Sequence, residues 1–142
     1  MKNTVKLIAL LLGFTLVFGT SCKKYEEGPN ISFLSAKSRI INTWKPDKYI
    51  DKHGAEITLT DSIKNGVTYD FQKDNAYIIT TTVTGAGDIL EHGKWALIED
   101  NTQLRLTSLA GGDPQITTIL RLKKNELGLQ NGDDSKIYFV TK

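Results

Sequence analysis

Apolar and polar residues alternate with a period of two along most of the chain after Thr43. In "VTYDF", for example, Val67, Tyr69 and Phe71 fall on one face of an extended chain. Such alternation is typical of β-strands that bury one face. The segments that show it are 43–50, 67–71, 76–83, 89–98, 103–107, 115–122, 126–130 and 136–142, with a weaker candidate at 56–60. We therefore expect eight or nine short strands.

The connections between these segments are rich in turn-forming residues. They are Asp74-Asn75, Gly85–Asp88, Asp100-Asn101, Gly111–Pro114 and Asn131–Asp134. Short strands at this spacing, with no helical pattern between them, indicate an antiparallel barrel or sandwich. "TGAGD" contains a Gly-x-Gly, but it joins two strands and therefore predicts a hairpin loop rather than a phosphate-binding loop.

Two of the predicted strands contain residues that affect how they can pair. Pro46 has no N–H to donate, so it predicts an edge position or the beginning of the first strand. In 115–122 the alternation places Ile116, Leu120 and Leu122 on the buried face, together with Thr118. A threonine hydroxyl there could orient a ligand or bond to a neighbouring group.

One segment ahead of the strands has a helical pattern. The apolar residues of 32–42 that can share one helix face are Phe33, Leu34, Ile40 and Ile41. Ser32 or Ser35 can cap its N-terminus. A helix this short is unstable alone, so we expect it to pack against the strands.

Residues 1–21 have the composition of an export signal. Lys2 and Lys6 flank the start of an almost wholly apolar run, Val5–Phe18, and small residues follow it. This order is typical of a secretory signal peptide, and the run is shorter than the roughly 20 residues that span a bilayer. An internal amphipathic helix is the alternative, but the run has no polar face.

Removing that signal changes the charge of the chain. The full chain has 18 lysines and arginines against 16 aspartates and glutamates, and loss of Lys2 and Lys6 leaves 16 of each. A neutral domain without a long basic run has no electrostatic basis for binding nucleic acid. The remaining residues are enough to bury a single core.

Cys22 is the only cysteine, and it directly follows the signal. It cannot form an intramolecular disulfide, and a catalytic thiol would need a base held beside it. "GTSC" after an apolar run resembles the lipobox of bacterial lipoproteins, although Gly19 stands where a leucine-like residue is usual. The resemblance implies that Cys22 is lipidated, and several acyl chains together hold a domain at a membrane.

The residues after Cys22 carry a second short pattern. "KKYEEGP" resembles the lysine-then-acidic signal that directs lipoproteins of Bacteroidetes to the outer face of the outer membrane. A solvated linker explains the same residues. We expect residues 22–31 to be a tether, and the protein to be an outer-membrane lipoprotein of the cell envelope, exposed at the surface if the signal acts.

The order of motifs over 32–142 resembles the lipocalin-like lipoproteins of Bacteroidetes. A short helix leads into "NTWKPDKYI", followed by "YDFQKDNAY", "HGKWALIEDNTQLRL", "ITTILRLKKNELGL" and "KIYFV". In the first motif, Asn42 stands where the family has glycine. The resemblance implies an all-β domain over 32–142, an antiparallel up-and-down lipocalin-like barrel of about eight strands with a short N-terminal helix.

The resemblance also suggests roles for particular side chains. In lipocalins a first-strand tryptophan closes the barrel floor and a basic residue from a late strand lies across it. Trp44 matches the first by position, and Arg121 is a candidate for the second. The aromatic residues that could line a pocket are Trp44, Tyr49, Tyr69, Phe71, Tyr77, Trp95 and Phe139. A small barrel can instead be filled by such side chains.

No group of residues has an enzymatic signature. His53 and His92 are the only histidines and lack the spacing of metal ligands. Glu91 and His92 are adjacent in a strand, so they point to opposite faces. Asp133-Asp134 predicts a solvated turn rather than a catalytic pair. We expect no enzymatic activity, no metal and no cofactor.

One tripeptide marks a candidate modification site. "DSI", Asp61–Ile63, matches the acceptor pattern for O-glycosylation in exported Bacteroidetes proteins, with Ser62 as acceptor. An Asp-Ser pair is also expected in a loop or a single helical turn, which the surrounding residues indicate. The sequence supports both a glycosylation site and an unmodified turn.

Two functions from different classes fit these features. The first is a monomeric, membrane-anchored module that binds a small apolar or amphipathic ligand. The second is an interaction protein with a filled core, whose loops contact an envelope partner or glycan. An apolar void of a few hundred Å³ would favour the first, and a packed interior the second.

Overall fold

The computed structural model describes residues 24–28 and 33–142. In these residues nine strands form one antiparallel sheet, and pairing of β1 with β9 closes all of it except β2 into an up-and-down barrel. The barrel strands are β1 Thr43–Ile50, β3 Val67–Phe71, β4 Ala76–Val83, β5 Gly87–Ile98, β6 Gln103–Ser108, β7 Gln115–Leu122, β8 Glu126–Gln130 and β9 Lys136–Thr141. The two-residue strand β2 (Glu56–Ile57) pairs with the end of β1. The all-β barrel predicted from the sequence is confirmed.

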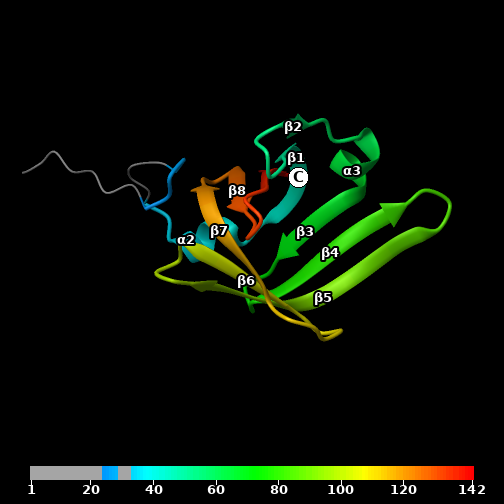
Figure 1. The fold of residues 1–142 in the computed structure, drawn as a ribbon. Coiled ribbons are helices and arrows are strands. Elements are labelled where there is room, and N and C mark those ends of the chain that lie inside the picture. Colours follow the sequence, from blue (N-terminus) through cyan, green and yellow to red (C-terminus); the bar gives the residue numbers. More distant parts are fainter. Residues whose placement is uncertain (1–23, 29–32) are drawn as a thin grey trace, which may run out of the picture.

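Two short helices lie at opposite ends of the barrel (Figure 1). Helix α2 (Ala36–Ile40) precedes β1, and the Ser35 hydroxyl caps it by accepting from the Ser38 N–H at 3.0 Å. Helix α3 (Asp61–Gly66) precedes β3 and is capped by Thr60. We refer to the end of the barrel that carries α2 as the floor and to the end that carries α3 as the mouth.

The apolar face predicted for the first helix is only partly correct. Ile40 is fully buried, and Ile41 packs against the core. Phe33 is fully exposed and Leu34 is half exposed, because α2 begins only at Ala36 and both residues precede it.

The core consists of the inward-facing positions of the strands. Together with Ile40 from α2, the buried barrel residues are Trp44, Phe71, Tyr77, Trp95, Leu104, Leu106, Ile119, Leu122, Leu127, Leu129 and Phe139. Burying a large apolar side chain of this kind contributes about 1.5–3 kcal/mol. The period-two pattern therefore identifies most of the core correctly.

Gly93 allows a close approach between a ring and a strand. A Cβ on this residue would lie 2.3 Å from Tyr77 Cε1 and 2.4 Å from the Thr107 carbonyl oxygen. Gly93 pairs directly with Tyr77 across β4 and β5. The Tyr77 ring thus occupies the space that a side chain at 93 would need.

A bulge in β7 changes which of its residues face the core. The register with β8 shifts between Ile119 and Arg121. Ahead of this bulge Thr117 and Ile119 are buried, whereas Ile116 and Thr118 are exposed. The prediction that Ile116 and Thr118 face inward was wrong, because an extra residue in a bulge inverts the alternation on one side of it.

A second irregularity explains the position of Pro46. The pairing of β1 with β9 shifts register between Pro46 and Lys48. Pro46 lies inside β1, so a position at the beginning of the strand was wrong. On one side, however, β1 pairs with β3 only up to Trp44 and with β2 only from Tyr49, so Pro46 does lie at a local edge. Strand prolines are also tolerated at bulges, where the ladder of hydrogen bonds is already interrupted.

Several predictions fall on residues outside the described ranges. They concern the signal peptide over 1–21 and the lipidation of Cys22, and the boundaries between signal, tether and barrel domain also stay predictions. Among the described residues, no helix has both the length and the apolar composition needed to cross a bilayer.

Candidate ligand-binding site

The interior of the barrel contains a cavity of about 120 Å³. It is lined by Trp44, Tyr49, Tyr69, Phe71, Leu106, Gln115, Thr117, Leu127, Leu129, Asn131, Ile137 and Phe139. Trp44 lies near the floor, while Gln115 and Asn131 lie at the mouth, and Gln115 is exposed. The cavity therefore reaches toward solvent at the mouth.

Most of the aromatic residues predicted to line a pocket do so. Five of the seven contribute to the cavity wall, namely Trp44, Tyr49, Tyr69, Phe71 and Phe139. The rings of Tyr69 and Phe139 meet edge to face, with centroids 5.0 Å apart.

Tyr77 and Trp95 face inward but are not part of the cavity wall. Both are buried in the core, and the Trp95 ring packs edge to face on Phe71 with centroids 5.9 Å apart. The Trp95 indole N–H donates to the Gln72 carbonyl oxygen at 3.1 Å. Both lie next to Phe71 of the cavity wall: Trp95 contacts its ring, and Tyr77 pairs opposite it across β3 and β4.

Trp44 connects the cavity to helix α2. It is fully buried, and its indole Nε1–H donates to the Ile40 carbonyl oxygen at 2.9 Å. Ile40 is the last residue of α2 and is itself fully buried. Trp44 therefore lies at the floor, as its resemblance to the first-strand tryptophan of lipocalins implies.

Arg121 does not take the role considered for it. Its guanidinium lies outside the barrel, 5.4 Å from the centre of the Tyr138 ring. The buried arginine near the floor is Arg39 of α2, which donates to the Leu122 carbonyl oxygen and lies 5.5 Å from the centre of the Tyr25 ring. Arg121 alternates with the inward-facing Leu122, so its side chain lies on the outer face and does not reach the floor inside the barrel.

A carboxylate on β5 shares the inward face of the sheet with the cavity wall, although it is not part of that wall. Tyr69, Ile79 and Glu91 pair in one row across β3, β4 and β5, so all three share the inward face of the sheet. The Tyr77 hydroxyl donates to Glu91 Oε1 at 2.7 Å. Sequence reasoning used Glu91 only to exclude a pair with His92, although its alternation with Trp95 already placed it on the inner face.

This carboxylate affects both neighbouring tyrosines. Burial, followed by the hydrogen bond to Glu91, raises the pKa of Tyr77 to about 12. Burial is also the main cause that raises the pKa of Tyr69, and the charge of Glu91 adds to it. Both phenols therefore stay neutral at physiological pH and can donate hydrogen bonds.

Part of the predicted tether is attached to the barrel. Tyr25 is buried, and its hydroxyl donates to the Asn101 carbonyl oxygen at 3.1 Å. The Glu27 N–H donates to the Leu120 carbonyl oxygen at 2.8 Å. Residues 24–28 thus pack on the floor end and the side of the barrel rather than lying free of it.

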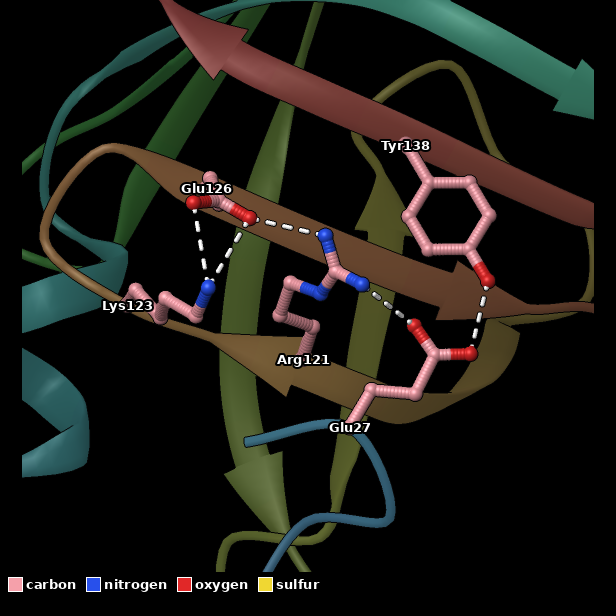
Figure 2. A network of polar contacts seen from close by, with 5 residues as sticks. All are labelled: Glu27, Arg121, Lys123, Glu126 and Tyr138. Atoms are coloured by element: carbon pink, nitrogen blue, oxygen red, sulfur yellow. Dashed lines mark hydrogen bonds and ion pairs between the residues drawn. The ribbon is translucent and has the colours of Figure 1, made fainter. Parts of the chain in front are cut away.

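The Glu27 side chain joins a polar network on the outer face (Figure 2). Its Oε2 is 3.1 Å from Arg121 Nη2, and its Oε1 accepts from the Tyr138 hydroxyl at 2.9 Å. Burial, followed by this hydrogen bond, raises the pKa of Tyr138 to about 12. Arg121 Nη1 also pairs with Glu126 at 2.7 Å.

The remaining candidate residues are separate from one another. His53 lies in the exposed loop between β1 and β2, and His92 pairs opposite Ile78, on the other face of β5 from Glu91. Asp133 accepts from the Ser135 hydroxyl at 2.6 Å, which lowers the pKa of its carboxyl. Within residues 24–28 and 33–142, no three His, Cys, Asp or Glu side chains gather in a way that could hold a metal ion.

Ser62 lies in α3 and is exposed. A modifying enzyme can therefore reach its hydroxyl without unfolding the barrel. Its O-glycosylation stays a prediction.

The fold is similar to those of solved bacterial proteins. A lipocalin-like protein from Bacteroides uniformis superimposes with a TM-score of 0.61 at 14% identity, covering 73% of this chain and 99% of that one. An uncharacterized protein from Bacteroides eggerthii gives a TM-score of 0.59 at 11% identity, covering 72% of this chain and 98% of that one. No protein-family model and no curated protein sequence matches the chain. The lipocalin-like resemblance is thus confirmed in the fold.

Proposed function

We propose that this protein is a lipid-anchored lipoprotein of the cell envelope whose barrel binds a small apolar or amphipathic ligand and catalyses no reaction. The observation that carries the proposal is the aromatic-lined cavity of about 120 Å³. A lipocalin-like barrel with such a cavity suits binding, because a few inward polar groups can orient a ligand that apolar walls hold.

The size of the cavity limits the ligand. An apolar protein cavity of about 150 Å³ can bind benzene, whereas drug-sized ligands need about 300–1,000 Å³. The interior is smaller than the few hundred Å³ expected for a typical small-molecule site, and it is not filled either. The ligand is therefore a single small ring or chain end, and the rest of a longer molecule extends through the mouth.

The anchor rests on the N-terminal sequence. The lipobox-like "GTSC" and the apolar run before it support lipidation of Cys22. Two solved barrels of similar fold come from Bacteroides species, which agrees with the Bacteroidetes-like signal after Cys22. We place the protein in the outer membrane, with its barrel at the cell surface.

Nuclear magnetic resonance with benzene as probe tests the binding proposal. The chain has two tryptophans, of which Trp44 lines the cavity and Trp95 does not. Each donates its indole N–H to a backbone carbonyl, so each should give a separate resonance. We expect benzene to shift the Trp44 indole resonance in a saturable way and to move that of Trp95 far less.

Two matched variants separate cavity binding from surface effects. Ile137→Phe adds volume inside the cavity, whereas Ile78→Phe makes the same change on the outer face of β4. Benzene binding should be lost in the first and kept in the second. If benzene leaves the Trp44 resonance of the wild type unchanged, the proposal is contradicted, and the interaction protein becomes the better account.

A further inference from the structure

We propose that Glu91 makes this site selective for ligands that join a small apolar group to a positively charged amine. The inference rests on the proposed function, since an apolar group held in the cavity is what would bring the amine to Glu91. It goes further by naming the charge of the ligand.

Glu91 faces the inside of the barrel and is open to solvent. Glu91 lies in the same inward-facing row as Tyr69, which lines the cavity, and is separated from it by the single strand β4. The side chain is exposed to solvent at the mouth, so a ligand can reach it. The Tyr77 hydroxyl holds Oε1, which orients the carboxylate and leaves Oε2 available as an acceptor.

The charges around Glu91 favour a cationic ligand. In the described part of the chain, no lysine, arginine or histidine forms an ion pair with Glu91. The polar side chains in the cavity wall, such as Gln115, Thr117 and Asn131, carry no charge. An anionic ligand head group would therefore meet an uncompensated negative charge, whereas an ammonium group would neutralise it.

The aromatic wall favours the same class of ligand. Tyr49 and Tyr69 line the cavity together with Phe139. The faces of such rings attract cations, and proteins use cages of aromatic rings to bind quaternary ammonium groups. The Glu91 carboxylate and the aromatic rings therefore both favour a cationic amine over a neutral alcohol, and a neutral alcohol over a carboxylate.

Three probes that share a phenyl ring test the selectivity. They are benzylamine, benzyl alcohol and benzoate, which carry a positive, a neutral and a negative group. Their dissociation constants can be measured from the Trp44 indole resonance. Because Glu91 is solvent-exposed, we expect benzylamine to bind up to about fivefold more tightly than benzyl alcohol, and less so as salt is added.

Two substitutions with the same change of charge locate the effect. Glu91→Gln keeps an oxygen that can accept from Tyr77, and it should abolish the preference for benzylamine. Glu99→Gln removes a carboxylate from the exposed turn before β6, at the floor end, and should keep the preference.

The outcomes distinguish the two proposals. If benzyl alcohol binds but benzylamine binds no more tightly, or if its advantage survives in Glu91→Gln, the cavity binds ligands and the amine selectivity is wrong. If none of the three probes, nor benzene, shifts the Trp44 resonance, the binding function itself is wrong.

Discussion

The hydroxyl of Tyr77 donates to the carboxylate of Glu91 at 2.7 Å, so a core residue orients a charge at the mouth of the barrel. The Tyr77 ring is only 2% exposed and lies against Gly93 on the neighbouring strand. The backbone of β5, the core ring and the site carboxylate are therefore linked by direct contacts. A change at Gly93 should reach the site through Tyr77.

Gly93→Ala should destabilise the barrel. The new Cβ would lie 2.4 Å from the Thr107 carbonyl oxygen, which is backbone, and 2.3 Å from the Tyr77 ring. Forcing extra volume into a packed core costs about 1–3 kcal/mol. Urea denaturation should show a loss of this size in the free energy of unfolding.

Gly132→Ala is the matched control for that substitution. No atom outside Gly132 and its two chain neighbours lies within 4 Å of the position that the Cβ would take. We expect a change of less than about 0.5 kcal/mol, as for ordinary surface substitutions. Equal effects of the two substitutions would contradict the role of Gly93 in packing Tyr77.

Tyr77→Phe should make the protein less sensitive to alkali. In the folded state the pKa of Tyr77 is about 12, above its ordinary value of 10.0. Between these two pH values the unfolded chain has released this proton and the folded chain still holds it, so the free energy of unfolding falls as pH rises. Below pH 10 the contribution is fully present.

Urea denaturation at several pH values between 9 and 12 measures this effect. The free energy of unfolding should fall less steeply in Tyr77→Phe than in the wild type. Part of the fall should remain, because the pKa of Tyr138 is also raised to about 12. Identical slopes would show that the Tyr77 proton is not held by the folded state.

Glu27→Gln should loosen the segment that precedes the barrel. It removes the charge that pairs with Arg121, and the two side chains of this pair are about one-third exposed. Ion pairs near the surface contribute about 0.2–1 kcal/mol, so global stability should change little. Local opening should show more clearly, as faster hydrogen exchange at the residue 27 amide, which donates to Leu120.

Glu26→Gln provides the comparison, since Glu26 is the exposed neighbour of Glu27. Exchange at residue 27 should stay close to that of the wild type in this variant. Faster exchange in both variants would mean that overall charge, and not the contact with Arg121 and Tyr138, holds the segment.

Cys22→Ala should release the protein from the membrane. The substitution removes the sulfur that we expect to carry the lipid, and no other part of the proposed anchor can replace several acyl chains. Fractionation of cells should move the protein from the membrane pellet to the soluble fraction, whereas Ser32→Ala should leave it in the pellet. An unchanged distribution of Cys22→Ala would contradict the anchor.

The period-two pattern predicted the barrel well because each strand buries one face. Five of the predicted segments, including 67–71 and 126–130, coincide with the observed strands residue for residue. Trp44 and Phe139 face the cavity as expected. Alternation identifies a face reliably wherever a strand is regular.

The errors occur where regularity ends. In β7, nothing in the composition of "QITTILRL" marks the bulge that exposes Ile116 and buries Thr117. Glu27 and Arg121 are 94 residues apart, and only the closed barrel brings them together. Glu91 could be placed on the inner face from its spacing to Trp95, but its contact with Tyr77 depends on the pairing of β4 with β5.

Native mass spectrometry of the protein purified from its own membranes shows whether the barrel holds a ligand in the cell. We expect a reproducible small-molecule mass bound to the wild type and to Ile78→Phe, absent from Ile137→Phe, and released when the protein is denatured. A wild-type protein that carries its acyl chains at Cys22 but no other bound mass would contradict the claim that the barrel is a ligand-binding module.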